Sequence, residues 1–201
     1  MPLISIEKIE TDVTLGLWQI TESVDEFFKL NPNLDFAYNS ISLYRSEARK
    51  RESLAIYTLL YKLTGNSKLQ IEHNSNGKPI VDGLNVSISH TKGYAALIIS
   101  KTKNVAVDIE YVSSRISKIV DKFIRKDEDA SCLEYQLINW STKEAVYKFY
   151  SEQNLQYFEM RLKPYDMRPY GIIEVENLKK EFLTHVNYRI NKYYVLTYMN
   201  D

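Results

Sequence analysis

Residues 104–112 read NVAVDIEYV, and this stretch predicts a β-strand. Apolar side chains recur at every second position, which is the period of a strand with one buried face. These apolar residues are Val105, Val107 and Ile109. The opposite face carries Asp108 and Glu110, about 6–7 Å apart along the pleat. From the strand alone, the two carboxylates could lie in solvent or could share a positively charged partner.

Predicted strands continue on both sides of this stretch. Residues 85–90 (NVSISH) and 94–100 (YAALIIS) come before it, joined by the short polar links TKG and KTKN. Such short links favour antiparallel hairpins, so we expect these three strands to pair in succession. Further strands are expected at 14–20, 69–73, 171–177 and 193–199.

Helical patterns lie between these blocks of strands. A capping box at Ser23 and Glu26 predicts a short helix that NPN at 31–33 stops. Longer helices are predicted, by composition and apolar spacing, at 46–63, 114–124 and 134–150. Helices grouped between strands indicate an α+β fold.

The composition excludes several classes of protein. The chain has 201 residues, with 26 Lys plus Arg and 26 Asp plus Glu, so no net charge attracts nucleic acid or an anionic membrane. Cys132 is the only cysteine, which excludes an internal disulfide and a CxxC metal site. The first residues lack a signal pattern, and the longest apolar runs are far shorter than the ~20 residues that span a bilayer. We therefore expect a cytoplasmic protein.

The predicted helix at 134–150 carries a third candidate carboxylate. Trp140, Glu144 and Lys148 follow one another at a spacing of four, on one face. Glu144 and Lys148 could simply form an exposed pair. If Glu144 faces Asp108 and Glu110 instead, the three acids would repel one another unless a cation lies among them. Three oxygen donors without His or Cys favour Mg²⁺.

Other candidates are weaker when each is taken alone. His90 and Ser89 lie in SISHT, and each is more often a structural residue than a functional one. Lys78 lies in NGKP, which is usually a turn. Arg49 and Arg51 belong to a basic group at the start of the helix at 46–63. These arginines either form a solvated basic face or bind a phosphate with their forked donors.

Taken in order, these segments resemble the motif series of the 4′-phosphopantetheinyl transferase superfamily. The likeness is to its larger class, the surfactin-synthetase-activating type, with two similar halves in one chain. The matching segments are GKP at 77–79, SISHT at 87–91, VAVDIE at 105–110, FIRKDE at 123–128 and WSTKEAVYK at 140–148. Ala106 departs from the family pattern, which usually has glycine before the first acid.

The resemblance implies a fold and an activity. It predicts two similar α+β lobes with pseudo-twofold symmetry, an N-terminal lobe at 1–102 and a C-terminal lobe at 103–201, with the site in the cleft between them. It also predicts a monomer that moves the 4′-phosphopantetheine arm of coenzyme A onto a serine of an apo carrier protein, acyl, peptidyl or aryl, and releases 3′,5′-ADP.

The resemblance also implies the roles of site residues. Asp108, Glu110 and Glu144 match the ligands of Mg²⁺. His90 and Lys148 match contacts to the phosphates of coenzyme A, and the remaining matches to coenzyme A are Lys78, Ser89 and either Arg49 or Arg51. As catalytic groups we expect His90, Lys148 and Glu144, the last as general base with a metal-bound water as the alternative.

Three alternative interpretations are open at this stage. The chain could be a non-catalytic homologue that binds coenzyme A or a carrier protein. It could be an unrelated Mg²⁺-dependent phosphohydrolase that uses the same three acids. It could also be a structural α+β domain whose acids are solvated.

Overall fold

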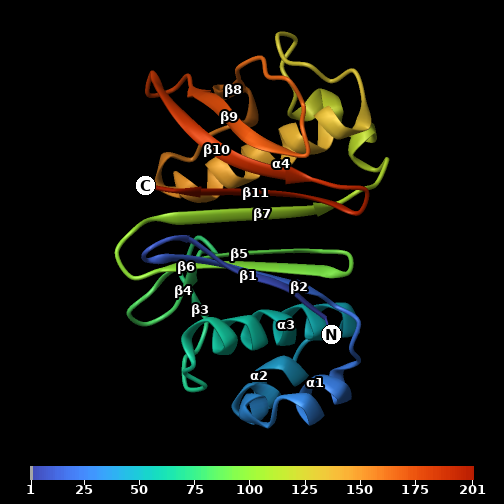
Figure 1. The fold of residues 1–201 in the computed structure, drawn as a ribbon, viewed down its shortest axis with the longest axis vertical. Coiled ribbons are helices and arrows are strands. Elements are labelled where there is room, and N and C mark those ends of the chain that lie inside the picture. Colours follow the sequence, from blue (N-terminus) through green and yellow to red (C-terminus); the bar gives the residue numbers. More distant parts are fainter. Residues whose placement is uncertain (1) are drawn as a thin grey trace. The chain divides into compact units, whose positions relative to one another are not determined.

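The computed structural model describes residues 2–201, apart from the side chains of Asn39 and Ser40 (Figure 1). Its contacts divide the chain into two compact units, Met1–Val105 and Ala106–Asp201. Each unit combines one long helix with antiparallel strands, so the fold is mixed α+β.

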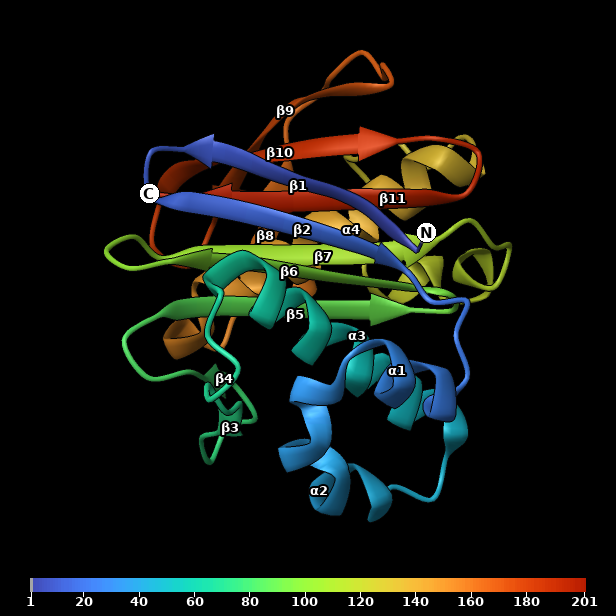
Figure 2. The ribbon, with the colours of Figure 1, turned by 60° about the horizontal axis from the view of Figure 1, so that its bottom comes forward.

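Unit 1 contains a four-stranded sheet in the order β1-β2-β6-β5 and a small hairpin of β3 and β4. The strands are β1 (Leu3–Glu10), β2 (Val13–Gln19), β3 (Glu72–His73), β4 (Pro79–Ile80), β5 (Asn85–Thr91) and β6 (Tyr94–Ser100). The helices are α1 (Val24–Leu30), the 3₁₀ helix η1 (Pro32–Ala37), α2 (Tyr38–Ser42) and α3 (Glu47–Thr64). Helix α3 contacts β2 and β6, and α1 and α2 pack against α3 (Figures 1 and 2).

Helix α3 is defined by clear local signals. The Ser46 side chain accepts a hydrogen bond from the Arg49 amide at its N-terminus, and Gly65 ends the helix in the left-handed conformation, at φ 70°. Leu59 of α3 is fully buried in the core of unit 1. A Cβ at Gly16 of β2 would lie 2.9 Å from Leu59 Cδ2, so the glycine allows the helix to approach the sheet closely.

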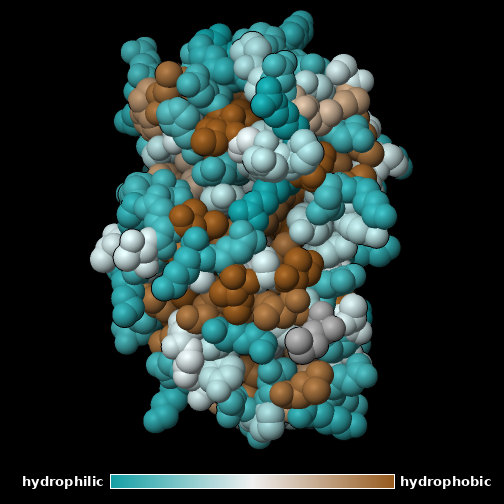
Figure 3. Space-filling view, in the orientation of Figure 1, coloured by the Kyte–Doolittle hydropathy of each residue, from teal (hydrophilic) through white to brown (hydrophobic). Residues whose placement is uncertain are grey.

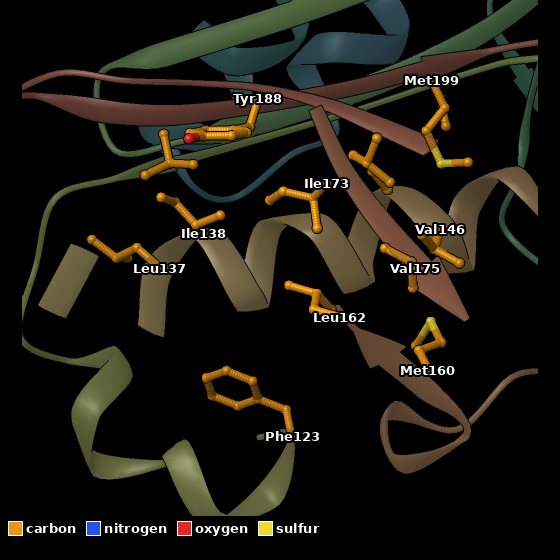
Figure 4. Close-up of a cluster of buried hydrophobic side chains, with 14 of the residues drawn as sticks. Phe123, Leu137, Ile138, Val146, Met160, Leu162, Ile173, Val175, Tyr188 and Met199 are labelled. Carbon is orange, nitrogen blue, oxygen red and sulfur yellow. The ribbon is translucent and has the colours of Figure 1, made fainter. Parts of the chain in front are cut away.

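Unit 2 contains a five-stranded sheet in the order β7-β11-β10-β9-β8. The strands are β7 (Val105–Tyr111), β8 (Met160–Leu162), β9 (Tyr170–Asn177), β10 (Phe182–Ile190) and β11 (Tyr194–Asn200). The helices are α4 (Leu133–Phe149) and the 3₁₀ turns η2 (Ile116–Lys118), η3 (Val120–Lys122), η4 (Ser151–Gln153) and η5 (Tyr157–Glu159). The hydrophobic core forms where α4 packs on β10 and β11 (Figure 4).

Several predicted elements are confirmed. The capping box at Ser23 and Glu26 opens α1, which ends at Leu30 before the predicted stop. The helices predicted at 46–63 and 134–150 are α3 and α4, each within one residue of the predicted bounds. The strands predicted at 14–20, 171–177 and 193–199 are β2, β9 and β11.

The expected pairing of the strands around 104–112 is wrong in one place. β5 and β6 form the predicted antiparallel hairpin. β7, however, lies beside β11 in the other sheet. The reason is that β6 already has β2 on one edge and β5 on the other, so it has no free edge for β7.

Two further expectations need correction, and one strand was not expected. The helix predicted at 114–124 is replaced by the short 3₁₀ turns η2 and η3, in a segment rich in β-branched residues that disfavour a regular helix. The strand predicted at 69–73 is reduced to β3. The edge strand β1 was not expected; its side chains alternate between half-buried and exposed, without a fully buried face.

Hydrophobic residues lie among hydrophilic ones on the face drawn in Figure 3, and several large hydrophobic side chains are exposed. Within residues 2–201, no helix combines the length and the apolar character needed to cross a membrane.

Candidate active site

Strand β7 brings two acids to one face of the sheet of unit 2. Asp108 and Glu110 are two residues apart, so their side chains project to the same side as Ala106. Ala106 is fully buried in the core that α4 covers, so its methyl group is accommodated where the family pattern has glycine. Asp108 is only 4% exposed and Glu110 is half-buried. A buried Asp108 excludes the solvated strand face as an explanation for this residue.

Helix α4 contacts both acids of β7. The Lys148 ammonium donates to Asp108 Oδ1 at 2.7 Å and to the Val107 carbonyl at 3.0 Å. Two turns earlier, Trp140 Nε1 donates to Glu110 Oε1 at 2.9 Å. The ammonium of Lys148 thus contacts an acid of the strand. The sequence alone had also allowed a simple exposed pair between Lys148 and Glu144.

Glu144 lies on α4 midway between these two contacts. Since Trp140 and Lys148 stand four residues before and after it, all three share the stripe that faces β7. Tyr157 donates a hydrogen bond to Glu144 Oε1 at 2.7 Å. Burial raises the pKa of Glu144, and the nearby carboxylate of Asp108 raises it further, against the opposing effects of Tyr157 and Lys148.

The three acids have the right chemistry for a hard cation, although each contacts a protein donor here. Within residues 2–201, no group of three His, Cys, Asp or Glu side chains is arranged to hold a metal ion. Asp108, Glu110 and Glu144 nevertheless supply only oxygen donors, from two elements that contact each other. Burial and Asp108 both disfavour the ionised form of Glu144, and a divalent cation at this site would reverse that effect. In donor chemistry, the three residues therefore suit Mg²⁺.

Unit 1 brings together two of the residues predicted to contact coenzyme A. Arg49 Nη1 of α3 lies 3.1 Å from His90 Nε2 of β5. Glu52 Oε2 lies 3.3 Å from His90 Nδ1 and 3.7 Å from Arg49 Nη1. A guanidinium can only donate, so Nε2 accepts and the imidazole proton lies on Nδ1, facing Glu52.

The other predicted residues of unit 1 occupy different environments. Arg51 is half-buried, two residues beyond Arg49 in α3. Lys78 is exposed in the turn between β3 and β4, where its amide donates to Asn74 Oδ1 at 2.9 Å. Ser89 is buried in β5, with 8% of its surface exposed. The structure thus places Arg49 beside His90.

Sequence reasoning missed a buried ion pair made by Lys143, the residue before Glu144 in α4. Lys143 Nζ lies 2.6 Å from Glu128 Oε2, and both side chains are fully buried. The ammonium also donates to the Phe123 carbonyl at 2.7 Å, and Glu128 Oε1 accepts from the Leu162 amide at 2.8 Å. This pair ties the segment before α4 to the helix and to β8. Lys143 stands three residues before Val146, which puts both side chains on the same buried face of α4. That spacing was the signal in the sequence that Lys143 is buried.

Tyr157 is the other residue that sequence reasoning missed. It lies in η5, thirteen residues beyond the acid that it contacts. No short spacing connects it to the helix stripe, so the sequence offered no signal for its role.

A protein-family model matches part of the chain. A search of curated proteins finds no match to the chain. Residues 104–199, which include β7 and α4, match the model of the 4′-phosphopantetheinyl transferase superfamily, and this match supports a phosphopantetheinyl transferase activity.

Proposed function

We propose that the protein transfers the 4′-phosphopantetheine arm of coenzyme A to a serine of an apo carrier protein, acyl or peptidyl, and releases 3′,5′-ADP. One observation carries the proposal: within the matched segment, the stripe of α4 that holds Glu144 faces the acids of β7. The surfactin-synthetase-activating type, two lobes of similar fold, a monomer and a cytoplasmic location are further parts of this proposal.

Asp108, Glu110 and Glu144 would hold Mg²⁺ in this reaction. When bound, the cation would neutralise charge on the diphosphate of coenzyme A. Without it, three carboxylates near one another repel an anionic substrate. Their burial strengthens that repulsion, because charges interact more strongly away from water.

Lys148 supplies a positive charge beside the same acids. Its ammonium lies 2.7 Å from Asp108, so a diphosphate bound by these carboxylates comes within its reach. A lysine in this position stabilises the charge that develops on the leaving phosphate. Its removal should therefore lower kcat more than it raises KM.

Glu144 is the proposed acceptor of the proton of the carrier serine. Its carboxylate lies on the stripe of α4 that faces the acids of β7, where a carrier serine brought to the diphosphate would meet it. The hydrogen bond from Tyr157 holds the carboxylate in one orientation.

Residues of unit 1 are proposed to contact the nucleotide part of coenzyme A. The Arg49 guanidinium beside His90 suits a phosphate, because its N–H groups can donate to the phosphate oxygens. His90 would add a donor only with a proton on Nε2, the atom that faces Arg49 here. Lys78 and Ser89 are proposed to contact the adenine nucleotide.

The decisive test is Asp108→Ala, assayed by the intact mass of apo carrier proteins incubated with coenzyme A and Mg²⁺. The wild-type protein should add the mass of phosphopantetheine to a carrier. Loss of a cation ligand removes several kcal/mol of charge stabilisation, so the variant should be slower by on the order of 10³-fold.

A matched control is Asp121→Ala, which removes an exposed carboxylate from the same unit. It should transfer at the wild-type rate. Melting curves of both variants show that the fold is kept. Binding of coenzyme A without modification of any carrier would indicate the non-catalytic homologue, and phosphate release without a protein acceptor would indicate the phosphohydrolase.

A further inference from the structure

Tyr157 contributes to a cluster of three aromatic rings beside the candidate active site. Its ring packs against Trp140 with 5.3 Å between centroids and an interplanar angle of 38°. Phe123 contacts both rings edge-on, with centroids 5.1 Å from Trp140 and 6.5 Å from Tyr157. Rings packed in this way restrict one another's rotamers, so the polar atoms that they carry are held in place.

Two rings of this cluster each donate a hydrogen bond to one of the candidate ligands. Trp140 Nε1 donates to Glu110, and the Tyr157 hydroxyl donates to Glu144. The two donors are fixed against each other by the ring contact, and so are the two carboxylates that accept from them. The cluster therefore sets the relative orientation of acids that come from a strand and a helix.

The backbone around Tyr157 is also fixed. Gln156 and Glu159 form a capping box around η5, in which the Gln156 amide donates to Glu159 Oε2 at 2.8 Å. The carbonyl of Glu159 accepts from the Leu178 amide just after β9, at 2.8 Å. Leu155 and Met160, on either side of η5, are buried in the core of unit 2. Tyr157 thus approaches Glu144 from a rigid segment.

We propose that Tyr157 is a positioning residue that acts through Glu144. Its hydroxyl engages one carboxylate oxygen and leaves the other to bind Mg²⁺ in a fixed orientation. This inference rests on the proposed function, because it assigns Glu144 to the cation. Hydrogen bonds to ligating carboxylates typically contribute 10–100-fold in metal affinity.

The test compares Tyr157→Phe with Tyr150→Phe. Each variant removes one hydroxyl from a half-buried tyrosine of unit 2 and keeps the ring. The Tyr150 hydroxyl lies 3.1 Å from Thr184 Oγ1, in a hydrogen bond that involves none of the candidate ligands. A merely structural role for Tyr157 predicts that both variants lose some thermal stability and keep their affinity for Mg²⁺.

Affinity is measured by calorimetric titration of the full chain with Mg²⁺, alone and with coenzyme A present. We expect Tyr157→Phe to bind Mg²⁺ about tenfold more weakly, and Tyr150→Phe to match the wild type. The transfer rate of Tyr157→Phe should recover as Mg²⁺ is raised. Unchanged or tighter binding by Tyr157→Phe overturns the inference, and so does a wild-type protein that binds no Mg²⁺.

The two proposals fail in distinguishable ways. A tenfold loss of Mg²⁺ affinity in Tyr157→Phe, with no carrier modified by the wild type, keeps the positioning role and rejects the transferase. Transfer by the wild type, with unchanged Mg²⁺ affinity in Tyr157→Phe, does the reverse.

Discussion

The long helices of the two units bury very different faces. In α3 the buried residues are apolar except Thr58, whose hydroxyl donates to the Leu54 carbonyl one turn earlier. In α4 half of the buried residues are polar, namely Asn139, Ser141, Thr142 and Lys143. Helix α3 carries Arg49 and Arg51 in its first turns, whereas α4 carries Glu144 and Lys148 in its C-terminal half.

The difference shows how each helix is stabilised. Helix α3 has a side-chain cap at Ser46 and a left-handed glycine at its end, so local signals and an apolar face are sufficient to define it. Helix α4 begins at Cys132 without a side-chain cap and depends on tertiary contacts to its polar residues. One of these contacts joins Ser141 to Thr197 of β11 at 2.9 Å. The polar face of α4 is thus held by contacts with neighbouring elements in addition to the apolar spacing that predicts the helix.

The largest expected effect comes from breaking the buried pair of α4. Lys143→Met removes the ammonium 2.6 Å from Glu128 and leaves a buried, uncompensated carboxylate. Loss of one partner of a buried pair typically destabilises a protein by about 3–5 kcal/mol. Urea denaturation followed by circular dichroism measures the change in the free energy of unfolding.

The matched control is in α3. Lys50 forms an ion pair of nearly the same length with Glu47, at 2.7 Å, but the Glu47 side chain is 67% exposed. Lys50→Met should change the free energy of unfolding by less than about 1 kcal/mol, because water screens such pairs. Equal losses in the two variants would show that the polar face of α4 is no more critical than the exposed end of α3.

The sequence predicted the parts of the site that depend on short spacing. The alternation at 105–109 identified β7, and the spacing of four from Trp140 to Lys148 identified the stripe of α4. The strand that pairs with β7 was not predictable in this way, because it depends on which sheet edges are free. Tyr157 and the Lys143–Glu128 pair were missed for a related reason: their partners lie thirteen and fifteen residues away, across turns.

A smaller effect is expected at the exposed end of α3. Arg49 lies beside His90, with 62% of its side chain exposed, so Arg49→Ala should affect ligand binding and leave stability almost unchanged. Loss of a charge-assisted contact to the 3′-phosphate should raise KM for coenzyme A about tenfold, and KM for 3′-dephospho-coenzyme A much less. Steady-state kinetics with both donors measures this ratio.

Arg51→Ala is the comparison for this prediction. If Arg51 is the residue that contacts the 3′-phosphate, its variant will show the larger preference for the dephosphorylated donor. Equal losses on both donors in both variants would remove this end of α3 from the coenzyme A site.

The smallest effect concerns the N-terminal caps of the two helices. Ser46→Ala removes the side-chain acceptor of the Arg49 amide and should destabilise unit 1 by about 1 kcal/mol. Cys132 occupies the equivalent position in α4 with an extended backbone, at φ −139° and ψ 169°, which suits a serine cap. Cys132→Ser should therefore stabilise unit 2, by about 0.5–1 kcal/mol. Urea denaturation of both variants measures whether the free energy of unfolding falls in Ser46→Ala and rises in Cys132→Ser. A destabilised Cys132→Ser would mean that the start of α4 is set by the packing around it, and that a local signal cannot replace the tertiary contacts on which this helix depends.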